Sequence, residues 1–279
     1  MGGAILAGAL SSSDGASPVL SATQTAVVEL DPVKRRSLKR SLGIVAFQDL
    51  QEGADWLKGI GGSKSVLLLA VKPQMLGEVA AAEGIAELTN RRLVISILAG
   101  VPAAKVELAL PGSRCVRVMP NLPASIGLGT TAIAGESSGS ATAADRAFAK
   151  KLFGAVGAPP VTVDESLLDA FTAVAGSGPA YLFLLAEAME AAAKEIGLSP
   201  SVSKAIVRST LAGAAMMLEQ STDTAGSLRE RVTSKKGTTA AALDVLAHRE
   251  FVKAMSAAIH AARDRGRELA GLAAATDVK

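Results

Sequence analysis

The strongest constraint on the fold is a change of pattern near the middle of the chain. In the first half, short apolar and β-branched runs alternate with segments of helical spacing. Strands that alternate with helices predict a parallel, doubly wound sheet with helices on both faces. The expected strands lie at residues 25–30, 65–71, 92–98, 114–119 and 130–135, and the expected helices at 32–42, 74–88, 102–110 and 142–156.

The second half has almost no β-rich run. After the segment "GAPPVTVDES", Ala- and Leu-rich stretches with helical spacing continue to the end of the chain. We therefore predict an α/β domain at residues 1–160 and an all-helical domain at residues 161–279. The expected helices of the second domain lie at residues 180–196, 202–220, 227–232, 240–247 and 251–272.

The predicted helices of the second domain look apolar around most of their circumference. One interpretation is a compact internal bundle. We favour the other, in which the bundle interlocks with a second copy of the chain, because a lone bundle of this size has little reason to bury every face.

Composition excludes several classes of function. The net charge is only +3, aromatic residues make up 3% of the 279 residues, and basic residues are not interleaved with aromatic ones, so we expect no nucleic-acid binding. No uninterrupted apolar stretch reaches membrane-spanning length, so no membrane partner is expected. The single cysteine, Cys115, allows no intrachain disulfide and fits a cytoplasmic protein. With only two histidines, no metal site is expected.

The first residues, "MGGAILAGAL", look like the end of a dinucleotide-binding turn, where the last glycines open a helix. The first half of such a turn is a buried strand that ends in G-x-G. We expect that half to lie before Met1, which makes Met1 an internal methionine; the alternative is a truncated product.

Three predicted strand ends carry candidate ligand contacts, because ligands of open α/β sheets lie beyond the carboxyl ends of the strands. The first, "LLLAVKPQM", places Lys72 where it faces either water, which we favour, or a phosphate. The second is "SILAGVP". The third, "VRVMPNLPASIGLG", holds Asn121 between two prolines, where its amide either binds a ligand or closes its own turn.

Two further stretches have glycines beside hydroxyl groups. In "FTAVAGSGPAYLF", the glycines around Ser177 either let a ligand approach closely or relieve a kink between helices. In "RVTSKKGTTAAALDVL", Ser234, Thr238 and Thr239 surround Gly237 at a predicted helix start. This turn is either a cradle for a carboxylate or an ordinary N-cap.

Five of these runs occur together in the order and spacing of one family. The runs "LAVKPQ", "SILAGV", "VRVMPNLPASIGLG", "DAFTAVAGSGPAY" and "VTSKKGTTAAALD" resemble pyrroline-5-carboxylate reductase, over residues 2 to about 269. The resemblance implies an oxidoreductase that reduces 1-pyrroline-5-carboxylate to L-proline with NAD(P)H, the last step of proline biosynthesis. It also implies a Rossmann-like domain followed by a helical dimerisation domain, in a homodimer or an oligomer of dimers.

The resemblance also implies roles for single residues. Thr238 is expected to act on the imine as the catalytic residue. The substrate is expected to contact Ser177, Ser234, Gly237 and Thr238. The cofactor, NADP or NAD, is expected to contact Gly2, Gly3, Ala70, Val71, Lys72, Pro73, Ile97, Leu98, Ala99 and Asn121.

Two departures from the family pattern leave alternatives open. Lys236 stands where the family usually has glycine, so its side chain either clashes in the turn or adds positive charge near the carboxylate. In "VVELDPVKRR", Asp31 favours NADH because an acid here accepts the ribose 2′-hydroxyl, whereas the basic run at residues 34–36 favours NADPH.

Two other functions compete with this one. A Rossmann reductase of the hydroxy-acid type is disfavoured because no lysine follows the "GSGPAY" run until Lys194. A non-catalytic dimer that has lost cofactor binding is the other alternative.

Overall fold

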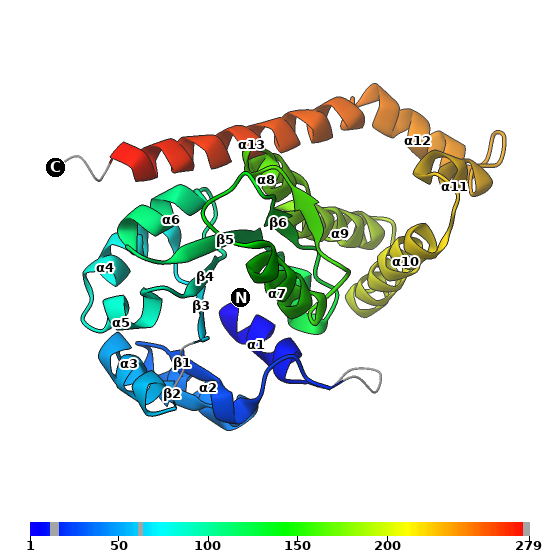
Figure 1. Cartoon of the computed structure of the whole chain (residues 1–279). Helices are drawn as coiled ribbons and strands as arrows, with labels where there is room; N and C mark the ends of the chain where they lie inside the picture. Colours follow the sequence, from blue (N-terminus) through cyan, green and yellow to red (C-terminus); the bar gives the residue numbers. More distant parts are fainter. Residues whose placement is uncertain (12–16, 61–63, 276–279) are drawn as a thin grey trace. The chain divides into compact units, whose positions relative to one another are not determined.

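The computed structural model describes residues 1–11, 17–60 and 64–275 (Figure 1). The chain forms two compact units, Met1–Ser177 with Ala262–Lys279, and Gly178–Ala261. The first unit thus extends past residue 160, where the sequence change suggests a boundary. It does so because the strand and helix that follow residue 160 pack onto the sheet, where Leu168 and Val163 join a core cluster with Ala132 and Ala134.

The strands of the first unit form two sheets. One is a parallel pair and the other has five strands in the order β3-β4-β5-β6-β7. Neighbouring strands in the larger sheet are parallel, as expected, except for β5 and β6, which are antiparallel. The strands are β1 (Ala26–Val28), β2 (Val45–Phe47), β3 (Val66–Leu69), β4 (Leu93–Ser96), β5 (Arg114–Met119), β6 (Ala132–Ala134) and β7 (Val161–Val163). A strand before Met1 stays a prediction.

Helices of the first unit follow the expected alternation, with two differences. The helix at Leu50–Gly59 lies where none was expected. The helix expected at residues 74–88 is broken into three pieces, and Gly84, at φ 84°, separates the last two. The helices are α1 (Gly2–Leu10), α2 (Pro32–Leu42), α3 (Leu50–Gly59), α4 (Leu76–Ala81), α5 (Ile85–Thr89), α6 (Ala103–Ala109), α7 (Ala143–Gly154) and α8 (Leu168–Phe171); the short turns are η1 (Ala22–Gln24), η2 (Pro73–Met75), η3 (Leu122–Ile126), η4 (Glu165–Leu167) and the π-helical η5 (Thr172–Gly176).

Both faces of the larger sheet are covered, which explains its continuously apolar strands. On β4, Ile95 faces the cluster that holds α1 and α7, while Val94 faces the cluster that holds α4, α5 and α6. Cys115 is fully buried in the second cluster, as expected for a small core residue. Burial there raises the pKa of its thiol, so it stays protonated.

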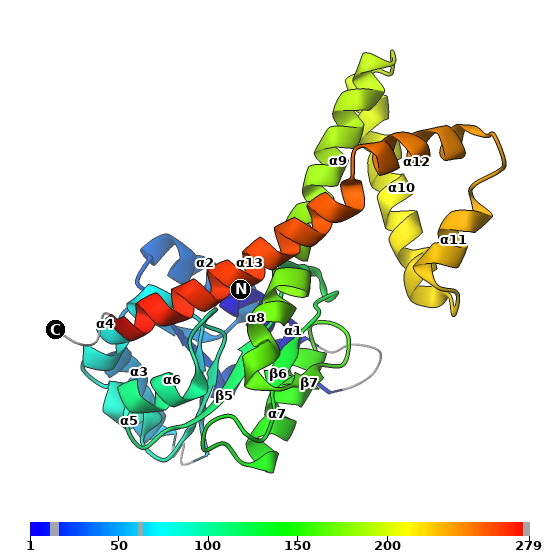
Figure 2. The same cartoon turned by 90° about the horizontal axis from the view of Figure 1, so that it is seen from above.

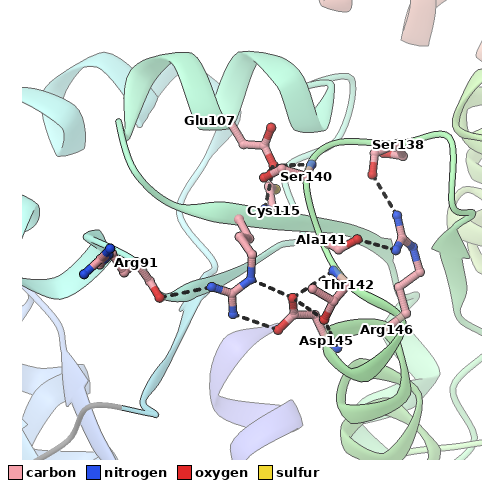
Figure 3. A network of polar contacts seen from close by, with 10 residues as sticks. Arg91, Glu107, Cys115, Ser138, Ser140, Ala141, Thr142, Asp145 and Arg146 are labelled. Atoms are coloured by element: carbon pink, nitrogen blue, oxygen red, sulfur yellow. Dashed lines mark hydrogen bonds and ion pairs between the residues drawn. The ribbon is translucent and has the colours of Figure 1, made fainter.

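Hydrogen bonds and an ion pair hold the loops beside β5 in place (Figure 3). Arg114 makes a two-pronged ion pair with Asp145, with distances of 2.8 and 3.0 Å. Asp145 also closes the capping box of α7 with Thr142. The hydrogen bonds from Arg114 and from Thr142 hold the pKa of Asp145 at about 2. Arg146 donates to the carbonyls of Gly135, Glu136, Ser138 and Ala141.

The second unit consists of helices. They are α9 (Gly178–Glu195), α10 (Pro200–Gln220), α11 (Ala225–Arg231), α12 (Thr238–His248) and the start of α13 (Phe251–Ala275). Figure 2 shows α9 and α10 side by side, and Ala193 and Val207 on them are buried. Many apolar side chains of this pair remain exposed in the single chain, namely Leu182, Phe183, Leu184, Leu185, Ile206, Met216, Met217 and Leu218.

One helical segment differs from the expectation that no apolar stretch reaches membrane-spanning length. The segment Glu165–Glu195 is long and apolar enough, by length and composition alone, to cross a membrane. Only 11% of its most apolar window is buried in the single chain. An apolar surface of this extent marks a place where something else covers the helix, either lipid or another protein surface.

Candidate active site

The first helix begins beside the end of a strand. A Cβ added at Gly2 would lie only 2.9 Å from the Cβ of Ala70, directly after β3, so a larger residue has no room there. The amides of Ala4 and Ile5 donate to the carbonyl of Met1, which leaves the amides of Gly2 and Gly3 without an intrahelical acceptor. Free amides at a helix N-terminus are a ready anion site, and they fit the phosphates of a dinucleotide.

The loops after β3 and β4 lie next to each other. The amide of Ile97 donates to the carbonyl of Leu69 at 3.2 Å, which extends the strand pairing into the loops. Ala70 and Lys72 are exposed, while Val71 and Pro73 are half-buried. This arrangement gives a small apolar wall with one cation beside it, and it leaves both interpretations of Lys72 open.

The second loop contributes less side-chain surface than the sequence suggests. Ile97 and Ala99 are half-buried, but the Leu98 side chain is only 1% exposed and belongs to the core. A contact from Leu98 to a ligand is therefore restricted to its backbone.

Asn121 ties two segments together. Its side-chain oxygen accepts a hydrogen bond from the amide of Thr130 at 2.9 Å, and its Nδ2 donates to the carbonyl of Ala175 at 3.0 Å. The side chain therefore does close its own loop, as one of the two interpretations holds, and it also anchors η5. A direct contact between Asn121 and the cofactor stays a prediction.

Ser177 ends the π-helical turn. Its amide donates to the carbonyl of Thr172 at 2.8 Å, and the residue is half-buried. Single π-helical turns inside helices occur frequently at functional sites. This geometry is compatible with both the kink and the ligand contact proposed for Ser177.

The hydroxyl-rich turn opens α12. The N-cap is Gly237, and no side chain caps this helix. A Cβ at Gly237 would lie 2.2 Å from Oγ of Ser234, so the serine hydroxyl fills the space that only glycine leaves. Thr238 is the first helical residue and is exposed. The N-cap interpretation of Thr238 and Thr239 is therefore wrong, and their hydroxyls are not used for capping.

The backbone donors of this turn differ from those expected. Gly237 is expected to contact the substrate, but its amide donates to the carbonyl of Ser234 at 3.0 Å. The first intrahelical bond of α12 runs from the amide of Ala241 to the carbonyl of Gly237. The amides of Thr238, Thr239 and Ala240 therefore lack intrahelical acceptors and are the ones that can receive an anion.

Lys236 adopts the left-handed conformation, with φ at 60°. This is the backbone state that glycine adopts most easily, which explains why glycine suits the position. The side chain is exposed, so the turn accommodates the lysine without burying its charge.

Asp31 plays a structural role. Its Oδ1 accepts hydrogen bonds from the amides of Val33 at 2.8 Å and Lys34 at 3.2 Å, and so caps α2. These two backbone hydrogen bonds lower the pKa of its carboxyl. The sequence also predicts this cap, because Asp31 stands directly before Pro32, and proline is common at the first position of a helix.

The predicted site residues fall in both compact units. Those expected at the cofactor lie in the first unit, at α1, the ends of β3, β4 and β5, and their loops. Ser177 ends this unit, whereas Ser234, Gly237 and Thr238 lie in the second.

Comparisons with known proteins agree with the resemblance found in the sequence. The model of the pyrroline-5-carboxylate reductase dimerisation family matches residues 165–269. Pyrroline-5-carboxylate reductase of Synechocystis is 36% identical over 269 residues, which is 96% of both chains. That of Pseudomonas aeruginosa is 40% identical over 206 residues, which is 74% of each chain.

Solved structures are similar as well. The pyrroline-5-carboxylate reductase of Coxiella burnetii superposes with a TM-score of 0.80 at 30% identity, covering 95% of this chain and 93% of that one. The Plasmodium falciparum enzyme, solved with NADP bound, gives a TM-score of 0.66 at 28% identity over 73% of this chain and 80% of its own.

Proposed function

The chain belongs to the pyrroline-5-carboxylate reductase family, and from this premise we propose that it reduces 1-pyrroline-5-carboxylate to L-proline, the last step of proline biosynthesis, with NADPH or NADH. The observation that carries the proposal is the turn before α12, whose exposed hydroxyls and free amides suit a small cyclic acid.

The reaction does not require an acidic side chain as proton donor. When bound, a reduced nicotinamide would supply the hydride that reduces the imine carbon, and one proton on nitrogen would complete the amine. A cyclic imine is basic enough to carry that proton near neutral pH. The protein must therefore mainly position its ligands and exclude water.

Thr238 is the residue proposed to touch the reacting group. Its hydroxyl can donate to a neutral imine nitrogen or accept from a protonated one, so it orients the ring in either state. The absence of a capping bond to this hydroxyl, within the described contacts, supports the assignment.

The substrate carboxylate is proposed to bind at the start of α12. Ser234 offers a hydroxyl, and the amides of Thr238 and Thr239 offer donors at the positive end of the helix. Gly237 permits the close approach of Ser234 to the backbone. Ser177 is proposed as a further substrate contact.

The cofactor is proposed to lie across the ends of β3 and β4. Gly2 and Gly3 fit its phosphates, because their amides are free at the start of α1. The residues proposed along the nicotinamide half are Ala70, Val71, Lys72, Pro73, Ile97, Leu98, Ala99 and Asn121.

We further propose a cytoplasmic homodimer or an oligomer of dimers. The exposed apolar surface of α9 and α10, within the residues that the dimerisation family model matches, supports a second copy rather than lipid as the cover. The single buried cysteine fits a reducing compartment.

The test uses the purified full chain. It should oxidise NADPH or NADH only when 1-pyrroline-5-carboxylate is added, and L-proline should be the product. A 2-oxo acid in place of the imine serves as control. Turnover of the 2-oxo acid without turnover of the imine would favour the hydroxy-acid alternative and overturn the proposal.

A further inference from the structure

The acidic residue directly after β1 bears on the choice of cofactor. The amide of Glu29 donates to the carbonyl of Phe47 at 3.0 Å, so Glu29 continues the pairing of β1 with β2 beyond Val28. It therefore stands at the carboxyl end of the strand. In nucleotide-binding α/β sheets, a carboxylate near this point accepts a hydrogen bond from the ribose 2′-hydroxyl, whereas an arginine nearby accommodates a 2′-phosphate.

The Glu29 carboxylate is held in place by the backbone. Its Oε1 accepts a hydrogen bond from the amide of Asp31 at 3.0 Å. An ionised carboxylate has about four acceptor sites, so this one bond fixes the group and leaves capacity for a hydroxyl donor. Asp31 differs, because both of its backbone bonds go through Oδ1 to cap α2.

The neighbouring cations are already engaged with protein oxygens. Nη1 of Arg35 donates to the carbonyls of Glu29 at 2.7 Å and Leu30 at 3.3 Å. Nζ of Lys34 lies 3.7 Å from Oδ2 of Asp31. Of the basic run, Arg36 lies farther along α2 and lines a shallow groove with Ser37 and Arg40.

These contacts leave the Glu29 carboxylate at the end of β1 with room for a hydroxyl donor. A 2′-phosphate there would meet the like charge of the Glu29 carboxylate, whereas a 2′-hydroxyl can donate a hydrogen bond to it. We propose that Glu29 accepts the ribose 2′-hydroxyl and that the chain binds NADH in preference to NADPH. This inference rests on the proposed function and deepens it by naming the cofactor.

The experiment measures binding without substrate. The fluorescence of NADH and of NADPH is titrated with the full chain, and the two dissociation constants are compared. We expect NADH to bind at least about tenfold tighter, the effect of one charge-assisted hydrogen bond. The variant Glu29→Gln keeps an acceptor for the amide of Asp31 but has no charge, and it should reduce the preference by about the same factor.

The matched control is Asp31→Asn. Asparagine caps helices as well as aspartate does, so α2 is retained and the cofactor preference should change less than about twofold. Melting temperatures of both variants check that the fold is intact.

Tighter binding of NADPH than of NADH by the unmodified chain overturns the proposal without any variant. An unchanged preference in a folded Glu29→Gln protein overturns it as well. Failure of the proposed function looks different, because NADH would then bind as expected while 1-pyrroline-5-carboxylate would not be reduced.

Discussion

The side-chain amide of Asn121 donates to the carbonyl of Ala175 at 3.0 Å, and so joins the loop after β5 to the π-helical turn η5. The two residues are 54 positions apart in the sequence, and Asn121 is only 7% exposed. The side-chain oxygen of Asn121 accepts a hydrogen bond from the amide of Thr130. One residue therefore fixes both the loop expected beside the cofactor and the turn that leads to Ser177.

We expect Asn121→Ala to lower the free energy of unfolding by roughly 2–4 kcal/mol, because it leaves a backbone amide and a carbonyl without partners in a buried place. Chemical denaturation measures the effect. Asn90→Ala is the control, since Asn90 is exposed, and it should cost less than about 1 kcal/mol. Equal effects of the two substitutions would contradict the anchoring role.

The ion pair of Arg114 with Asp145 predicts a dependence of stability on acid. The pKa of Asp145 is lowered from 3.8 to about 2, so its contribution is complete above pH 4 and is lost as the pH falls through about 2. Because the Arg114 side chain is 34% exposed, we expect the pair to contribute only about 1 kcal/mol.

Denaturation of Asp145→Asn against the unmodified chain tests this. The difference in unfolding free energy should be present at pH 6 and shrink as the pH approaches about 2. A difference that stays constant over this range would mean that the charge of Asp145 is not the cause.

Much of the first unit could be predicted from sequence because long apolar strands and their ends have clear patterns. The expected strands 65–71, 92–98 and 114–119 contain β3, β4 and β5. β2 and β7 were missed. Their length alone is not the reason, because β1 and β6 are equally short and lie within the expected strands 25–30 and 130–135. The antiparallel direction of β6 was missed because direction depends on how the loop after Met119 folds, not on strand composition.

The site could be predicted less fully, for a different reason. Residue types at the turn before α12 suggested a cradle, but which amide is free depends on backbone bonds. The amide of Gly237 donates to the carbonyl of Ser234, so the first amides available to an anion are those of Thr238 and the residues after it. Similarly, the sequence places two acids close together, and the hydrogen bonds show that Asp31 caps α2 while Glu29 accepts the amide of Asp31.

Lys236 offers a test of backbone strain. At φ 60°, a lysine lowers the free energy of unfolding by about 1 kcal/mol through backbone strain that glycine avoids. Glycine, however, loses more conformational entropy on folding. Lys236→Gly should therefore be neutral or slightly stabilising. Lys235→Gly, next to it and without a positive φ, should destabilise by roughly 0.5–1 kcal/mol. Equal losses in both variants would rule out strain at Lys236.

The proposed dimer predicts a response to charge on α9. Phe183 is 55% exposed in the single chain, so Phe183→Glu should leave the monomer folded but place a charge in the interface. Sedimentation at micromolar concentration should show a dimer or larger assembly for the unmodified chain and a shift toward monomer for the variant. Leu108→Glu, at an 81% exposed site on α6, is the control and should keep the assembly. A stable, well-folded monomer of the unmodified chain would contradict the proposal.

The Thr238 hydroxyl is proposed to orient the imine, and the kcat/KM of Thr238→Ala for 1-pyrroline-5-carboxylate tests this role. We predict a loss of roughly ten- to a thousandfold, as for a hydrogen bond made in the transition state. Thr238→Ser should recover much of it, and Thr239→Ala should change it little. Melting temperatures should stay close to that of the unmodified chain, because no capping bond is removed. Full turnover by Thr238→Ala together with a large loss in Thr239→Ala would contradict this role of Thr238.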